Sequence, residues 1–146
     1  MAFTGDFMCS SFKVEILTAL HDFTTTTGHV FKMALYDNTA TLTAATTIYT
    51  TSGELASAGN YTTAGNVIAS VTPVLDGTTA VCDFSPDEVW STATFTAYGG
   101  LIYNDTHASD AAVSVVDFGG AKTATAGDFT VQFPAAASAT AIIRIA

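Results

Sequence analysis

The chain has 146 residues, of which 49% are hydrophobic and only 12% are charged, and its formal net charge at pH 7 is −9. This length suits one domain with a sizeable core. Only four Lys and Arg residues are present, so the chain lacks the basic surface that nucleic acid or an anionic membrane requires, and we expect neither as a partner.

The N-terminal sequence MAFTGDFMCSSFK has no basic region followed by an apolar core, which predicts that there is no signal peptide. No stretch approaches the roughly 20 apolar residues of a membrane span. We therefore expect synthesis in a reducing cytoplasm. Cys9 and Cys82 are too few and too far apart for a zinc signature, and are predicted to be free, buried thiols.

Residues 1–10 are predicted to be an extended N-terminal arm in which Phe3 and Phe7 are apolar anchors, and residues 11–146 a single β-rich domain. The domain is predicted to begin with an amphipathic helix over residues 11–23, because apolar residues recur there every three or four positions. These residues are Phe12, Ile16, Leu17, Leu20 and Phe23. The β-branched Thr24–Gly28 run would end the helix.

After Gly28 the pattern predicts strands. The first covers His29–Tyr36 and is followed by a long excursion, Thr39–Gly65, with one short strand at Thr47–Thr50. A hairpin is predicted between Val67–Leu75 and Thr79–Phe84, across the turn pair Asp76-Gly77. The remaining predicted strands are Thr92–Tyr103, Ala112–Phe118, Phe129–Phe133 and Ala141–Ile145.

Glycine pairs and acidic residues punctuate these strands. Gly99-Gly100 is expected to bend its strand, and Gly119-Gly120 to end a strand and enter a turn. Asp87-Glu88, after Pro86, is expected to open a helical turn. About eight strands and one helix predict a mainly all-β fold, an antiparallel β-sandwich or jelly-roll-like barrel with one short N-terminal amphipathic helix.

No set of residues matches a catalytic, cofactor-binding or metal-binding pattern. His21 is expected to lie at the end of the helix, and His107 in a solvated loop whose spacing fits neither a zinc nor an EF-hand site. Asp117-Phe118-Gly119 lacks every other kinase element. The five tyrosines are interpreted as packing groups of a sheet, with a sugar-binding face as the alternative. The sequence therefore predicts a protein that is not an enzyme.

Several stretches together resemble a group of small tailed-phage virion proteins. They are MAFTGDFMCSSFKVEIL, HVFKMALYDNTATL, the pattern W-x-x-A-T-F-T-A, LIYND, VVDFGG and GDFTVQFP, which cover nearly the whole chain. The resemblance implies a structural protein incorporated into a virion assembled in the bacterial host cytoplasm. It implies no catalytic motif and no cofactor, and it leaves head, tail and fibre open.

Of these places, we expect a capsid decoration (cement) protein, because an N-terminal helix and arm can grip a shell while the β-body forms an oligomer. A trimer is favoured over a dimer, and the partner would be the major capsid protein or another virion protein. The expected assembly interface consists of Phe3, Phe7, Phe12, Ile16, Leu17 and Leu20. The alternative is a tail or fibre component that binds host-surface glycans through the tyrosines of Thr39–Gly65 or the loop Asn104–Asp110.

Overall fold

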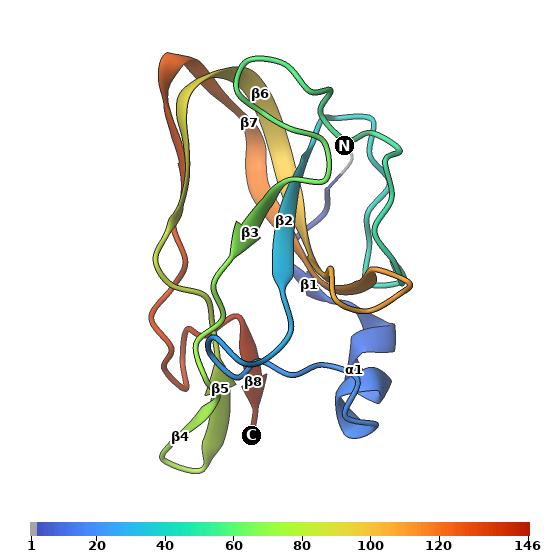
Figure 1. The fold of residues 1–146 in the computed structure, drawn as a ribbon, viewed down its shortest axis with the longest axis vertical. Coiled ribbons are helices and arrows are strands. Elements are labelled where there is room, and N and C mark those ends of the chain that lie inside the picture. The colour runs from blue at the N-terminus through green and yellow to red at the C-terminus, as the bar shows by residue number, and fades with distance from the viewer. Residues whose placement is uncertain (1–2) are drawn as a thin grey trace.

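A computed structural model describes residues 3–146 and confirms the all-β fold class, with antiparallel sheets and one short helix (Figure 1). The larger sheet has the strand order β1-β7-β6-β2-β3, and the smaller sheet has the order β4-β5-β8. This strand order does not confirm the jelly-roll arrangement. The elements are β1 (Phe7–Met8), α1 (Ser10–Leu17), β2 (Phe31–Tyr36), β3 (Asn66–Ile68), β4 (Val74–Asp76), β5 (Thr79–Cys82), β6 (Glu88–Asn104), β7 (Ala111–Val131) and β8 (Ile143–Ile145).

One long hairpin, β6–β7, forms the frame of the molecule and arches over its upper end (Figure 1). The two strands predicted at Ala112–Phe118 and Phe129–Phe133 belong to the single strand β7. The prediction that Gly119-Gly120 ends a strand is wrong. Both glycines have positive φ, at 70° and 127°, and they lie in a bulge where residues 118–121 face only Tyr98 across the register. The glycines bend the strand and the pairing resumes beyond them.

The strands β6 and β3 pair with the two edges of the central strand β2. Other segments cover its faces, so that β2 is buried on both of them. The long excursion was predicted correctly, since residues 37–65 separate β2 from β3 without a strand of their own. The short strand expected at Thr47–Thr50 is reduced to one bridge, between Ile48 and Ala111.

The hairpin around Asp76-Gly77 is confirmed, with Asp76 opposite Thr79 and Gly77-Thr78 at the turn. Its first strand is shorter than predicted, because the stretch Val67–Leu75 is divided between β3 in the larger sheet and β4 in the smaller one. Pro73, which lacks an N–H group, lies between the two.

The helical turn expected at Asp87-Glu88 does not form. Glu88 is the first residue of β6, and the Asp87 carboxylate accepts the backbone N–H of Phe133 at 2.9 Å.

The helix α1 ends at Leu17, so the prediction of a helix over residues 11–23 is too long. Ala19 has a φ of 58°, which breaks the helical path. The chain then turns inward, so that the His21 ring lies against Phe12, with a centroid distance of 4.9 Å. Phe23 follows in an irregular segment and stacks on Phe31 at 4.3 Å. Leu20 and Phe23 therefore continue the helical spacing without continuing the helix.

The N-terminal arm is part of the sheet. Phe7 and Met8 form β1 and pair with Val115 and Ser114 of β7. Phe3 is buried in the core and fills the space over Gly99, where a Cβ atom would lie 2.5 Å from the Phe3 ring. Residues 3–9 of the predicted arm thus pack against their own domain, and residues 1 and 2 lie outside the described part of the chain.

Two glycines with similar backbone angles provide a matched test of this packing. Gly65 has a φ of 71° and a Cβ there would lie 1.9 Å from the Met33 carbonyl oxygen, whereas Gly77 has a φ of 62° and no atom within 4 Å. We expect Gly77→Ala to lower the free energy of unfolding by only the left-handed strain of about 1–2 kcal/mol. We expect Gly65→Ala to lower the free energy of unfolding by more than about 4 kcal/mol. Urea denaturation of both variants measures the difference, and equal losses would contradict the packing described here.

Candidate functional site

The six residues expected to form an assembly interface do not share one surface. Phe3 and Phe12 are buried in the chain's own core, and Phe7 and Ile16 pack partly against that core. Leu20 is half-buried. Leu17 alone of the six is exposed, with 85% of its surface accessible. Helical spacing identified the apolar residues correctly, but the face of α1 with Leu17 points away from the core.

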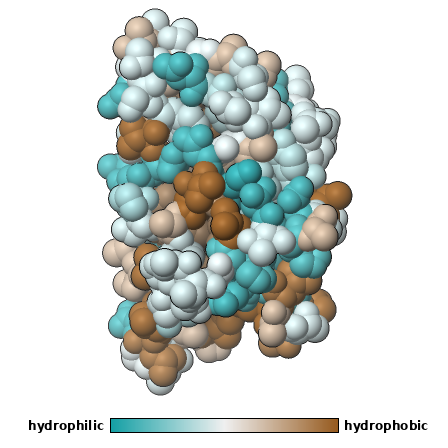
Figure 2. Space-filling model, in the orientation of Figure 1, coloured by the Kyte–Doolittle hydropathy of each residue, from teal (hydrophilic) through white to brown (hydrophobic). Residues whose placement is uncertain are grey.

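Exposed apolar side chains gather at the end of the molecule where α1 and the smaller sheet lie (Figures 1 and 2). They come from α1, β4 and β8, and we call them the apolar end surface: Val14, Leu17, Leu75 and Ile145. Val14 and Leu17 are three positions apart and share one helix face. Leu75 and Ile145 both pair with Ala80 of β5, so they lie on the same face of the smaller sheet.

A small apolar hollow lies between α1 and the smaller sheet, next to Ile145 of this surface. Its volume is about 50 Å³, and its accessible lining is wholly apolar. Ile16 from α1 and Ile145 from β8 are both among its lining residues, together with Phe23, Pro73, Val81 and Ile143. Segments that are far apart in the sequence therefore meet at this hollow, although Val14, Leu17 and Leu75 are not among its lining residues.

The outer edge of β7 is a second exposed feature. The strand β1 pairs with this edge only at Ser114 and Val115, and within residues 3–146 no strand pairs with it from Val116 to Val131. Two adjoining hollows of about 460 and 490 Å³ follow the edge and share Val116, Val131 and Gln132. We call them the edge groove. Unpaired edges are the positions in a sheet where a further strand can add.

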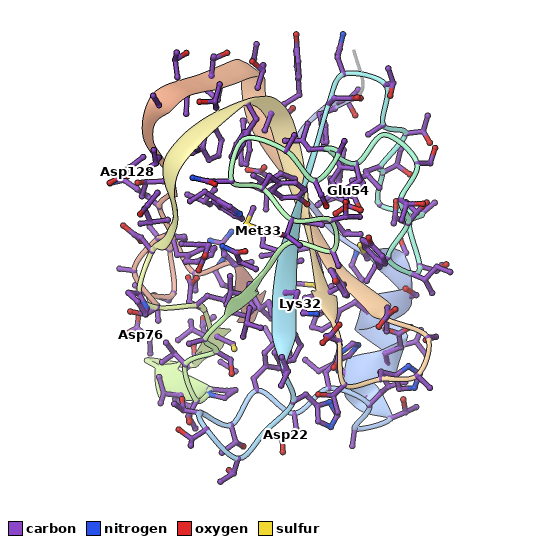
Figure 3. All side chains as sticks on the ribbon, turned by 45° about the horizontal axis from the view of Figure 1, so that its top comes forward. Asp22, Lys32, Met33, Glu54, Asp76 and Asp128 are labelled. Carbon is purple, nitrogen blue, oxygen red and sulfur yellow. The ribbon has the colours of Figure 1, made fainter. Side chains whose placement is uncertain are left out.

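The tyrosines form a buried polar cluster around Glu54, which lies on the side of β2 covered by the excursion (Figure 3). The Glu54 carboxylate accepts the hydroxyl of Tyr61 at 2.7 Å, the hydroxyl of Tyr49 at 2.5 Å and the N–H of Ala64 at 2.6 Å. Tyr36 and Tyr103 donate to the carbonyls of Thr50 and Ala64. These hydroxyls hold the excursion onto β2 and β6, which agrees with the interpretation of the tyrosines as packing groups.

A second buried polar cluster surrounds Asn104, the last residue of β6. The Asn104 amide donates to Nδ1 of His21 at 3.1 Å and to Nδ1 of His29 at 2.9 Å. Nε2 of His21 lies 2.8 Å from a carboxylate oxygen of Glu15 in α1. His21 is 8% exposed and Asn104 is fully buried. His21 thus lies beyond the helix end and faces inward. No pattern in the sequence indicated its contact with Asn104.

The remaining candidate groups have ordinary local partners. His107 bonds to Ser109 at 2.7 Å within its loop, and Asp117 accepts the N–H of Gly119. Cys9 and Cys82 are free and buried, as predicted, and burial raises the pKa of each thiol to about 12. Within residues 3–146 no group of three or more His, Cys, Asp or Glu is placed to hold a metal ion. No helix in this described part is long and apolar enough to cross a membrane.

Comparisons with protein-family models, with curated proteins and with solved structures found no match to this chain. The resemblance to phage virion proteins stays a prediction.

The tyrosine cluster predicts loss of stability at high pH. Burial raises the pKa of Tyr36, Tyr61 and Tyr103 far above the ordinary value of about 10. Burial and then the Glu54 carboxylate do the same for Tyr49. An acid whose pKa is raised in the folded state contributes stability that is present below the unfolded pKa and is lost as pH rises above it.

We therefore expect the native protein to show, near pH 11, much less tyrosinate absorbance than the urea-unfolded chain, with unfolding as the pH rises further. A spectrophotometric titration near 295 nm measures this. Equal tyrosinate absorbance in both states near pH 11 would show that the cluster is open to solvent.

Proposed function

We propose that the protein is a structural component of a tailed-phage virion, a capsid decoration protein that binds the assembled head as an oligomer. The observation that carries this proposal is the apolar end surface. Val14, Leu17, Leu75 and Ile145 are 64%, 85%, 73% and 52% exposed. Apolar patches of this kind mark contacts with other protein surfaces.

The free energy gained by burying these apolar side chains supports assembly through the apolar end surface. Burying an exposed Leu or Ile side chain contributes roughly 1.5–3 kcal/mol, so a few such residues can supply a large share of a specific contact. Desolvation of charge opposes this gain very little, because only 12% of the residues are charged and the patch itself is apolar. The partner in this proposal is the major capsid protein or another virion protein, with three-fold self-association favoured over two-fold.

The alternative, a tail or fibre module that binds host glycans, has weaker support from the structure. It requires exposed aromatic rings. Tyr61 is 2% exposed, and its hydroxyl is bonded to Glu54. Tyr49 is half-buried and stacked on Tyr103 at 4.7 Å. The tyrosines of the excursion are therefore occupied within the domain, which favours the decoration protein.

A matched pair of variants tests the proposal. We expect the double variant Leu17→Asp with Leu75→Asp to lose self-association and to bind purified heads at least about tenfold more weakly, since two charges would be desolvated in the contact. Val67→Asp is the control, because Val67 is also an exposed apolar residue, at 58%, but lies on β3 in the larger sheet. Light scattering with size-exclusion chromatography gives the oligomer mass, and co-sedimentation with heads lacking the protein gives binding. Undiminished binding by the double variant would exclude the apolar end surface.

Copy number in purified virions separates the two functions. On the order of hundreds of copies, counted by quantitative mass spectrometry against the major shell protein, would follow shell symmetry and support decoration. Roughly three, six or twelve copies would place the protein on the tail axis and favour the alternative. Absence from the particle would exclude both.

A further inference from the structure

The orientation of one buried amide fixes the protonation of two histidines. The Oδ1 atom of Asn104 accepts the backbone N–H of Thr106 at 3.1 Å, so the NH₂ group must point the other way, toward His21 and His29. Turning the amide over would set an NH₂ group against the Thr106 N–H. Since Nδ2 of Asn104 is only a donor, Nδ1 of each ring must accept, and both rings are neutral in this arrangement.

Protonation of the buried His21 ring is incompatible with its hydrogen bond to Asn104. An imidazolium carries a proton on both nitrogens, so its Nδ1–H would face the Asn104 NH₂ group at about 3 Å, donor against donor. In His21 the other nitrogen, Nε2, already donates to the Glu15 carboxylate. The extra proton therefore has no acceptor in the cluster, and a buried donor without an acceptor destabilises the folded state.

Some of the charged groups around the two rings favour protonation of a ring, and others oppose it. For His21, the Glu15 carboxylate of α1 favours the imidazolium, whereas burial and the neighbouring His29 and His107 oppose it. Burial is the largest of these effects, and the pKa of His21 is lowered overall. The Asp22 carboxylate is electrostatically coupled to His29, and Asp105, the residue after Asn104, forms an ion pair with Lys32 of β2. Opposing charges are thus present, but they do not supply an acceptor at either Nδ1.

The cluster links α1, the segment before β2 and the end of β6 by polar contacts. Glu15 belongs to α1, His21 and His29 flank the loop below β2 that contains Asp22 (Figure 3), and Asn104 ends β6. Within the cluster, α1 is tied to the larger sheet through the chain of contacts Glu15–His21–Asn104. Phe23 and Thr25 are held separately, by stacking on Phe31 and by bonds to Ser70 and Thr72. Loss of the cluster would therefore loosen residues 10–22 first.

We propose that His21, His29 and Asn104 form a pH-sensitive latch, which holds α1 and residues 18–22 against the end of β6 at neutral pH and loosens them on acidification. This inference does not depend on the proposed function. A base whose protonation is disfavoured in the folded state contributes stability that is present above the unfolded pKa, about 6.5 for histidine, and is lost as pH falls below it. The latch therefore opens as the pH falls below about 6.5.

Hydrogen exchange with mass spectrometry, corrected for the intrinsic pH dependence, tests the latch on the intact chain at pH 7.5 and pH 5. We expect protection of residues 10–22 to fall by about tenfold or more at the lower pH, while β6 and β7 keep theirs. Uniform protection at both pH values would overturn the proposal. His107→Gln is the matched control, because His107 bonds to Ser109 in its own loop and lies outside the hydrogen bonds of Asn104, and this variant should keep the direction of the wild-type pH response.

The decisive variant is Asn104→Asp. A carboxylate at this position still accepts the Thr106 N–H, but it also accepts Nδ1–H from both rings, so protonated histidines become the favoured partners. We expect the pH response to reverse, with residues 10–22 better protected at pH 5 than at pH 7.5. An unchanged direction would overturn the latch. If this variant does not fold, His21→Gln replaces it: the amide can accept from Asn104 and donate to Glu15 without titrating. A wild-type pH response in His21→Gln would equally exclude the proposal.

Discussion

The antiparallel pairing of β6 with β7 is the constraint on which the rest of the structure depends. The other strands of the larger sheet attach to this pair directly or through β2: β2 pairs with β6, β1 pairs with β7, and β3 pairs with β2. The end of β6 supplies both Asn104 to the histidine cluster and Tyr103 to the tyrosine cluster. The bulge near Gly119 then bends this pair, so that one hairpin can both line the core and arch over it.

Local sequence patterns correctly predicted the structural features that short-range interactions determine. The hairpin around Asp76-Gly77 was predicted because these residues favour a tight turn in any surroundings. The alternation in His29–Tyr36 predicted β2, which begins at Phe31, two residues later than predicted. The helix and the glycine pair show where such signals fail. Leu20 and Phe23 keep the helical spacing, but the contacts of His21 require the chain to leave the helix. Gly119-Gly120 resembles a turn because glycine permits both a turn and a bulge.

The candidate surface could be predicted only in part, for the same reason. Leu17 was named from the sequence, but Leu75 and Ile145 are isolated apolar residues in separate strands, and only their shared pairing with Ala80 places them on one face, on either side of Ala80. The two polar clusters were missed altogether. Glu54 and Asn104 look like ordinary polar residues in the sequence, and the tyrosines and histidines that they contact are 5 to 83 positions away along the chain.

The free outer edge of β7 has a consequence for storage at high concentration. A long, flat, unpaired strand edge acts as a template on which identical chains add without limit, the first step toward fibres. Here Gly119, Gly120 and Ala126 all have positive φ, and the bulge and the arch divide the edge into short stretches that point in different directions. The row of free backbone groups is too irregular to match a second copy over its full length. The irregular edge therefore opposes unlimited strand addition between folded copies, and the net charge of −9 adds electrostatic repulsion between them.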